Sequence, residues 1–200
     1  MVFCIQYLVF RMGKQERLDL LNKKWVHDCT CVLRDTATQA VLGHGSVHAK
    51  ILFIGEAPGK KEDAQGIPFI GSAGKLLGEL LAGIHLSRED VYVTNIVKYR
   101  PPDNRDPSPE EILACQEWLI EEIRIINPKV IVTLGRHAMG HFLPDAKISE
   151  VHGKLFRENI PSLGMRNILP LYHPAAALYN GGLRATLFQD FKKVSQLMKK

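Results

Sequence analysis

Four apolar runs of strand length alternate with segments of helical periodicity along this chain. The runs are KILFIG (50–55), VYVTNIV (91–97), KVIVTLG (129–135) and RNILPLYH (166–173), and their β-branched and aliphatic residues are typical of buried parallel strands. Residues 72–84, 108–126 and 136–143 place apolar residues three and four apart, as amphipathic helices do. The order predicts a three-layer α/β/α fold around a central, mostly parallel four-stranded sheet.

The second predicted helix has a recognisable start. Ser108 is a suitable N-cap, and acidic residues follow it in the first turn, where they favour the helix dipole.

The length of the chain bounds the number of domains. The 200 residues, 46% of them hydrophobic, are enough for one well-buried domain. We expect residues 28–200 to form it, preceded by an N-terminal extension and helix over residues 1–27. The opening MVFCIQYLVFRM lacks a basic region before its apolar run and is shorter than the roughly 20 residues that cross a bilayer. We therefore expect no membrane anchor and no secretory signal, with Met1 or Met12 as the start.

The net charge and the cysteines indicate the kind of partner and the cellular compartment. A formal charge of +5 and a pI near 9.0 favour an anionic partner such as nucleic acid, although many enzymes share this balance. Four cysteines, Cys4, Cys29, Cys31 and Cys115, in a chain without a secretory signal indicate a reducing, cytoplasmic compartment. We expect these thiols to bind metal, react or pack, and we expect no disulfides.

Polar residues follow the predicted strands at the point where each strand ends. Glu56 follows the first strand, Asn95 ends the second, Gly135 ends the third and His173 ends the fourth. Singly, such an asparagine is usually a turn former and such a histidine is usually satisfied by its neighbours. The carboxyl ends of parallel strands meet at one edge of a sheet, where ligands bind. An acid, an amide and an imidazole together at this edge predict a binding or catalytic site.

Three ordered motifs carry a resemblance to a known family. Residues 55–77 (GEAPGKKEDAQGIPFIGSAGKLL), 91–112 (VYVTNIVKYRPPDNRDPSPEEI) and 172–178 (YHPAAAL) together resemble the family 4 uracil-DNA glycosylases, from about Cys29 to the C-terminus. The resemblance implies a three-layer α/β fold and hydrolysis of the N-glycosidic bond of deoxyuridine in base excision repair. It also implies uracil-containing DNA, single- or double-stranded, as the partner. We expect a monomer.

The matched motifs imply roles for particular residues. Phe69 would stack on the flipped uracil, Asn95 would hydrogen-bond its edge through the amide, and Ala57 would line the same loop. His173 would contact uracil O2, where negative charge develops. Glu56 would face the sugar and position or polarise the attacking water.

Further residues are assigned to the active-site region or to DNA contact, on less specific motifs. Glu62 and Asn104 lie at family positions in the active-site region, and the alternative for either is exposed surface. Ser72 opens a helix whose free N–H groups can meet a phosphate, and Leu178 is a candidate wedge for the space that a flipped base leaves. The candidate DNA-contacting cations, each alternatively a solvated side chain, are Lys98, Arg100, Arg105 and Arg136.

The resemblance also implies a [4Fe-4S] cluster on four cysteines, and here the chain departs from the family. The family has C-x-x-C before the first strand, but this chain has Asp28 at the first ligand position, Cys31 at the second and Cys29 out of register. Tyr99 stands where the third cysteine belongs, and Cys115 matches the fourth.

Four thiolates normally hold such a cluster, so we expect no cluster in this chain and no cofactor for the chemistry. We expect Tyr99 to pack against the helix that carries Cys115 and Trp118. If a cluster is present, its ligands include Cys29, Cys31 and Cys115.

Two other functions remain open. One is a catalytically weakened or DNA-trapping relative that binds uracil-containing DNA. Relatives that bind DNA covalently use a histidine in an inserted basic loop after the second motif, and PPDNRDPSPEEI has neither feature. The other is a nucleotide- or base-binding enzyme of unrelated chemistry.

Overall fold

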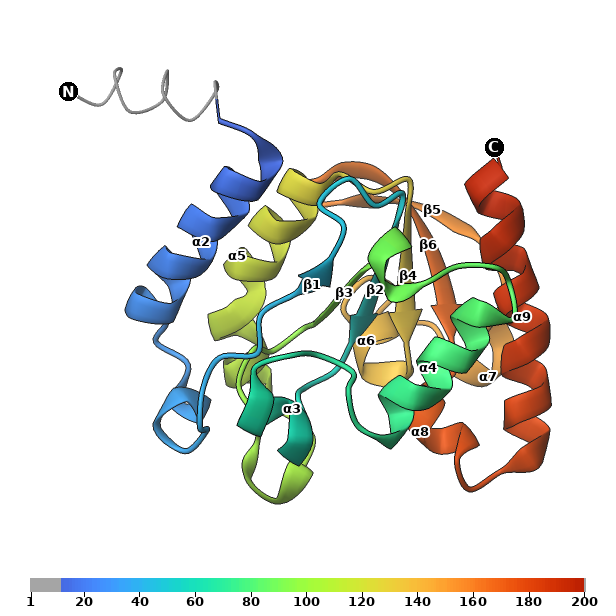
Figure 1. The fold of residues 1–200 in the computed structure, drawn as a ribbon, viewed down its shortest axis with the longest axis horizontal. Helices are drawn as coiled ribbons and strands as arrows, with labels where there is room; N and C mark the ends of the chain where they lie inside the picture. The colour runs from blue at the N-terminus through green and yellow to red at the C-terminus, as the bar shows by residue number, and fades with distance from the viewer. Residues whose placement is uncertain (1–11, 200) are drawn as a thin grey trace.

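The computed structural model describes residues 12–199, which fold as a six-stranded sheet between two layers of helices (Figure 1). The strand order is β1-β3-β2-β4-β6-β5. The four central strands, β2 (Ile51–Gly55), β3 (Tyr92–Asn95), β4 (Val130–Leu134) and β6 (Gly164–Leu171), are parallel, which confirms the predicted parallel core. At the two edges, β1 (His44–Gly45) and β5 (Phe156–Ile160) pair antiparallel, so the sheet has two more strands than predicted.

Alternate residues of each central strand face opposite helical layers. Ile51 and Phe53 of β2 pack into one hydrophobic core with α4 (Ser72–Ala82) and α9 (Gly181–Lys199). Leu52 and Ile54 pack into the other core with α5 (Pro109–Ile126) and α6 (Arg136–Gly140). In Figure 1, α2 (Lys14–Asp28) and α5 lie to the left of the sheet, whereas α4 and α9 lie to its right. The three-layer prediction is therefore confirmed.

The N-terminal helix α2 (Lys14–Asp28) packs against α5. Trp25 stacks on Trp118 with 6.1 Å between the ring centroids, and Trp118 Nε1 donates a hydrogen bond to Asn22 Oδ1 at 3.0 Å. The expected extension before this helix, with Cys4 and the choice of start, falls on residues 1–11 and lies outside the described residues. None of the described helices is long and apolar enough to cross a membrane.

Helix α5 begins as predicted. The backbone N–H of Glu111 donates to Ser108 Oγ at 3.3 Å, and the Glu111 carboxylate accepts from the Ser108 N–H at 2.7 Å, which completes a capping box. This cap fixes the end of the loop over residues 101–107, next to the carboxyl edge of the sheet.

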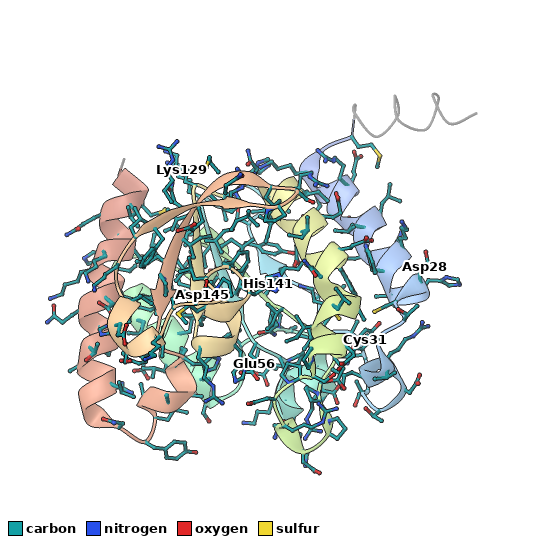
Figure 2. The ribbon with its side chains drawn as sticks, turned by 180° about the vertical axis from the view of Figure 1, so that it is seen from behind. Asp28, Cys31, Glu56, Lys129, His141 and Asp145 are labelled. Carbon is teal, nitrogen blue, oxygen red and sulfur yellow. The ribbon has the colours of Figure 1, made fainter. Side chains whose placement is uncertain are left out.

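Short helices cover the carboxyl edge. They are α3 (Lys60–Gln65) after β2 and α8 (Pro174–Ala177) after β6, while α7 (Ile148–Val151) precedes β5. Figure 2 shows Glu56, which follows β2, at the opposite end of the sheet from Lys129, which precedes β4. The parallel strands therefore bring Glu56, Asn95 and His173 to one edge, as predicted.

Candidate active site

A cavity of about 350 Å³ opens at the carboxyl edge of the sheet. It is lined by most of the predicted site residues, which come from the loops after β2, β3 and β6 and from the start of α4. These residues are Glu56, Ala57, Glu62, Phe69, Ser72, Asn95, Asn104, Arg105 and His173. Lys98, Arg100 and Leu178 are not part of the lining.

Asn95 ends β3 with a side chain that is buried in the protein but lines the cavity. Among the described residues, its Oδ1 atom has no hydrogen-bond partner. An unpaired buried acceptor costs about 1–3 kcal/mol, so a ligand that donates to this oxygen gains an interaction that the protein does not supply. Gly55 permits the placement, because a Cβ there would lie 2.5 Å from Asn95 Oδ1.

Phe69 lies beside His173, with 5.8 Å between ring centroids and 34° between ring planes. Its backbone is left-handed, with φ 57°, a conformation that costs a residue with a side chain about 1–3 kcal/mol. Glu62 supports this turn, because its Oε1 accepts from the backbone N–H groups of Ile70 at 3.0 Å and Gly71 at 2.8 Å. Glu62 thus lines the cavity and also holds the loop that carries Phe69.

His173 is the N-cap residue of α8 and presents a neutral imidazole. Its Nδ1 accepts from the Ala175 N–H at 3.1 Å, which leaves the proton of the neutral ring on Nε2. Burial lowers the pKa of His173 to about 4, so the ring carries no charge at neutral pH. Gly135 packs closely below it, since a Cβ there would lie 2.9 Å from His173 Cβ.

Glu56 is a partly buried carboxyl group whose pKa lies close to neutral pH. Burial, followed by the charge and the hydrogen bond of Asp106, raises the pKa of Glu56 to about 7, whereas Arg136 acts in the opposite direction. Both protonation states of Glu56 are therefore populated near neutral pH, which suits a group that accepts a proton during a reaction.

The prediction that Lys98 contacts DNA is wrong, because its side chain has no exposed surface. Lys98 Nζ pairs with Glu122 Oε2 at 2.6 Å, donates to the Asn95 carbonyl oxygen at 3.0 Å and also bonds Thr94 Oγ1. Glu122 in turn accepts from the Tyr92 hydroxyl at 2.9 Å. This buried network lies under the end of β3 and fixes the backbone that carries Asn95.

Two other predicted cations lie at the surface near the cavity. Arg105 forms a two-bond pair with Glu111, at 2.8 and 2.6 Å. Arg100 Nε donates to Asn104 Oδ1 at 2.8 Å, so the exposed Asn104 ties two parts of one loop together. Both guanidinium groups keep exposed surface, which is the condition for a phosphate contact.

The predicted helix start and wedge are both exposed. Ser72 is the first residue of α4 and lines the cavity. Leu178 follows α8 and is exposed, and the neighbouring Tyr179 is 93% exposed. Tyr179, the residue after the predicted wedge, was not among the predicted site residues.

Asp106 and His137 lie beside Glu56 and were also missed. Asp106 belongs to the loop before α5 and lines the cavity, and His137 belongs to the first turn of α6. Arg136 Nη2 donates to Asp106 Oδ2 at 3.1 Å. Possible ligand atoms of Glu56, Asp106 and His137 lie within 4.8 Å of one another, but Asp106 is exposed and already forms an ion pair with Arg136, so we assign no metal to them. The available signal was the place of His137, two residues after the strand-end Gly135.

The cysteines form a second buried group, next to α5. Cys29, Cys31 and Cys115 are free thiols that share a hydrophobic cluster with Tyr99 and Trp118. A hydrogen bond from Cys115 lowers the pKa of Cys29 to about 6. The Tyr99 ring meets the Trp118 ring edge-on, with 6.5 Å between centroids, which confirms the predicted packing of Tyr99 against this helix.

This group does not match the ligands of a [4Fe-4S] cluster. Within residues 12–199 it offers three thiols and the Tyr99 phenol, whose hydroxyl has no hydrogen-bond partner among those residues. Burial raises the pKa of Tyr99 to about 12, so the phenol stays protonated. Asp28, at the other expected ligand position, is half exposed and bonds His27 at 2.6 Å. Four thiolates normally hold such a cluster.

The fold and the cavity define an α/β domain with a binding site at the carboxyl edge of its sheet, lined by both polar and apolar residues. Residues 42–196 match the uracil DNA glycosylase superfamily, and the chain belongs to this superfamily. It is 45% identical to the type-4 uracil-DNA glycosylase of Archaeoglobus fulgidus, over 91% of this chain and 94% of that protein. For the type-4 uracil-DNA glycosylase of Saccharolobus solfataricus the identity is 46%, over 92% and 87%. For that of Thermotoga maritima it is 41%, over 94% and 97%. The resemblance predicted from the three motifs is confirmed.

Proposed function

We propose that this chain is a monofunctional uracil-DNA glycosylase, which hydrolyses the N-glycosidic bond of deoxyuridine in DNA. The products are free uracil and an abasic site, which other enzymes of base excision repair would process. The proposal includes a monomeric enzyme that acts on DNA in the cytoplasm.

The observation that carries the proposal is the joint placement of Phe69, Asn95 and His173 on one cavity. A flipped base needs an aromatic or apolar face to stack on and hydrogen-bonding groups for its edge. Phe69 supplies the face. The Asn95 amide supplies one donor and one acceptor, which complement an adjacent C=O and N–H of uracil. Cytosine presents the reversed pattern and is rejected.

His173 and Glu56 act on the two sides of the bond that breaks. As the bond between C1′ and N1 lengthens, negative charge develops on uracil O2, and the neutral His173 Nε2–H donates a hydrogen bond to it. Ionised Glu56 faces the sugar, positions the attacking water and stabilises the positive charge that develops on C1′.

The residues around the cavity hold the DNA backbone. Flipping a base costs a few kcal/mol, which contacts to the phosphates offset. The first turn of α4, from Ser72, offers free backbone N–H groups, and Arg100, Arg105 and Arg136 offer cationic side chains. Leu178 is the proposed wedge.

The experiment that tests the function uses labelled oligonucleotides that contain one uracil, cytosine or thymine at the same position. After incubation with the protein, alkali cleaves abasic sites. We expect cleavage of the uracil substrate only, in single- or double-stranded form. Uracil DNA that is bound but left uncleaved would instead identify a DNA-trapping relative.

Replacing Asn95 by alanine tests the assignment of the uracil-recognising amide. We expect the ratio of excision rates for uracil and cytosine to fall by about 10- to 100-fold, because a well-placed pair of hydrogen bonds contributes about 1–3 kcal/mol of discrimination between bases. Asn159→Ala, at an exposed position of β5, is the control and should leave the ratio unchanged. An unaltered ratio in Asn95→Ala would reject the assignment.

We propose that the enzyme works without an iron–sulfur cluster. Protein purified without oxygen should be colourless and should contain far less iron than the roughly four atoms per chain of a [4Fe-4S] cluster. Visible spectroscopy and iron analysis measure both. A brown preparation with about four irons per chain would contradict the proposal and would make Tyr99 and Asp28 the next ligands to test.

A further inference from the structure

Asp106 lies beside Glu56 in the lining of the cavity. The two residues come from different elements, Glu56 from the end of β2 and Asp106 from the loop before α5. Their carboxylate oxygens lie within 4.8 Å of each other. On its outer side, Asp106 is held by Arg136, whose Nη2 donates to Oδ2 at 3.1 Å. A carboxylate at this separation disfavours the ionised form of the partly buried Glu56.

We propose that Asp106 is a positioning residue whose negative charge acts on Glu56 and makes Glu56 the proton acceptor for the attacking water. The inference rests on the proposed glycosylase function and extends it to a residue that neither the motifs nor the sequence pattern singled out. Asp106 acts through Glu56 and is not required to touch the substrate.

The other charged groups near Glu56 do not replace Asp106 in this role. From the start of α6, the Arg136 cation bonds Asp106, and its Nε donates to His137 Nε2 at 2.9 Å. His137 Nε2 is 3.9 Å from Glu56 Oε1 and 3.1 Å from Asp106 Oδ2, but it is already used as the acceptor for Arg136.

The remaining ionisable groups of the cavity are engaged with other partners. Glu62 accepts from backbone N–H groups after Phe69, and Arg105 is paired with Glu111. His173 is neutral at the pH values of interest, because burial holds its pKa at about 4. Asp106 is therefore the negatively charged neighbour that raises the pKa of Glu56 beyond the effect of burial.

The groups described above account for the proton and the electron pair that move during hydrolysis of the glycosidic bond. The water oxygen forms a bond to C1′ as the C1′–N1 bond breaks, and the electron pair of that bond leaves on uracil, whose O2 receives the His173 hydrogen bond. The proton that the water loses passes to the Glu56 carboxylate. A carboxylate with a pKa near 7 accepts this proton at neutral pH better than one with an ordinary pKa.

The test is the pH dependence of Asp106→Asn, measured in single turnovers at saturating enzyme. In the unaltered protein, we expect the rate of uracil release to rise as the pH passes about 7, where Glu56 ionises. Asparagine keeps the shape of Asp106 but removes its charge, so the pKa of Glu56 falls and the midpoint moves to lower pH by about one unit. Above the midpoint the rate is several-fold lower, because Glu56 is then a weaker base.

Asp103→Asn is the matched control. Asp103 is an exposed residue of the same loop and does not line the cavity. Its replacement removes the same charge and should leave the midpoint of the pH–rate profile in place. A merely structural role of Asp106 would lower the rate equally at every pH. An unmoved midpoint in Asp106→Asn would overturn the inference while leaving the glycosylase function intact.

A second measurement does not depend on activity. The side-chain carboxyl resonance of Glu56 in protein with ¹³C-labelled glutamate, identified by its loss in Glu56→Gln, reports the pKa directly. We expect it to titrate near pH 7 and about one unit lower in Asp106→Asn. Equal titration in both proteins would contradict the inference. Absence of uracil release from the unaltered protein would instead contradict the proposed function.

Discussion

We expect His173→Ala to lower the single-turnover rate of uracil release by about 10²- to 10³-fold, which is the usual cost of removing one hydrogen-bond donor to a developing anion. The loss falls mainly on the chemical step, because charge on uracil O2 develops only as the bond breaks. Binding of uracil-containing DNA weakens far less. Rapid-quench kinetics at saturating enzyme, together with a binding titration, measure the two effects separately.

His48→Ala is the control for this variant. His48 is exposed and lies in the turn before β2, at the end of the sheet away from the cavity, so its loss should change neither rate nor binding. Equal single-turnover rates for His173→Ala and the unaltered protein would show that another group stabilises the leaving uracil.

We expect Glu122→Ala to lower the free energy of unfolding by about 3–5 kcal/mol, the usual cost of leaving one partner of a buried ion pair uncompensated. Lys98 has no exposed surface with which to reach water, and the Tyr92 and Thr94 hydroxyl groups lose an acceptor as well. Denaturant unfolding monitored by tryptophan fluorescence measures the change.

Glu121→Ala is the matched control on the same helix, because Glu121 is partly exposed and, within residues 12–199, its ion-pair partner is the exposed Arg124. It should change the free energy of unfolding by less than about 1 kcal/mol. The double variant Lys98→Met with Glu122→Leu removes both charges together and should recover much of the loss. Equal losses in Glu121→Ala and Glu122→Ala would contradict the buried pair.

The parallel core could be predicted because β2, β3, β4 and the second half of β6 are buried, and strands buried on both faces form mainly apolar runs. The edge strands could not be predicted by the same signal. Strand β1 has two residues, and β5 alternates between exposed and more buried residues in FRENI. Their pairing depends on neighbours that only the tertiary structure supplies.

The site residues that lie at strand ends or in the three motifs were predicted from the sequence. Asn95 and His173 follow strands, so topology alone brings them together. The error at Lys98 arose because its partner Glu122 lies on α5, 24 residues away, and nothing next to Lys98 in the sequence indicates that contact. Asp106 was missed for the same reason, since its approach to Glu56 depends on the path of the loop that the Ser108 cap terminates.

The most direct test of the account is the amount of free uracil released from a uracil-containing oligonucleotide, determined by chromatography alongside the number of abasic sites in the same DNA. We expect one free uracil for each abasic site, from an intact DNA backbone, and a strongly reduced yield at early times for His173→Ala. DNA that keeps its uracil, or a backbone that is cut without release of uracil, would contradict it.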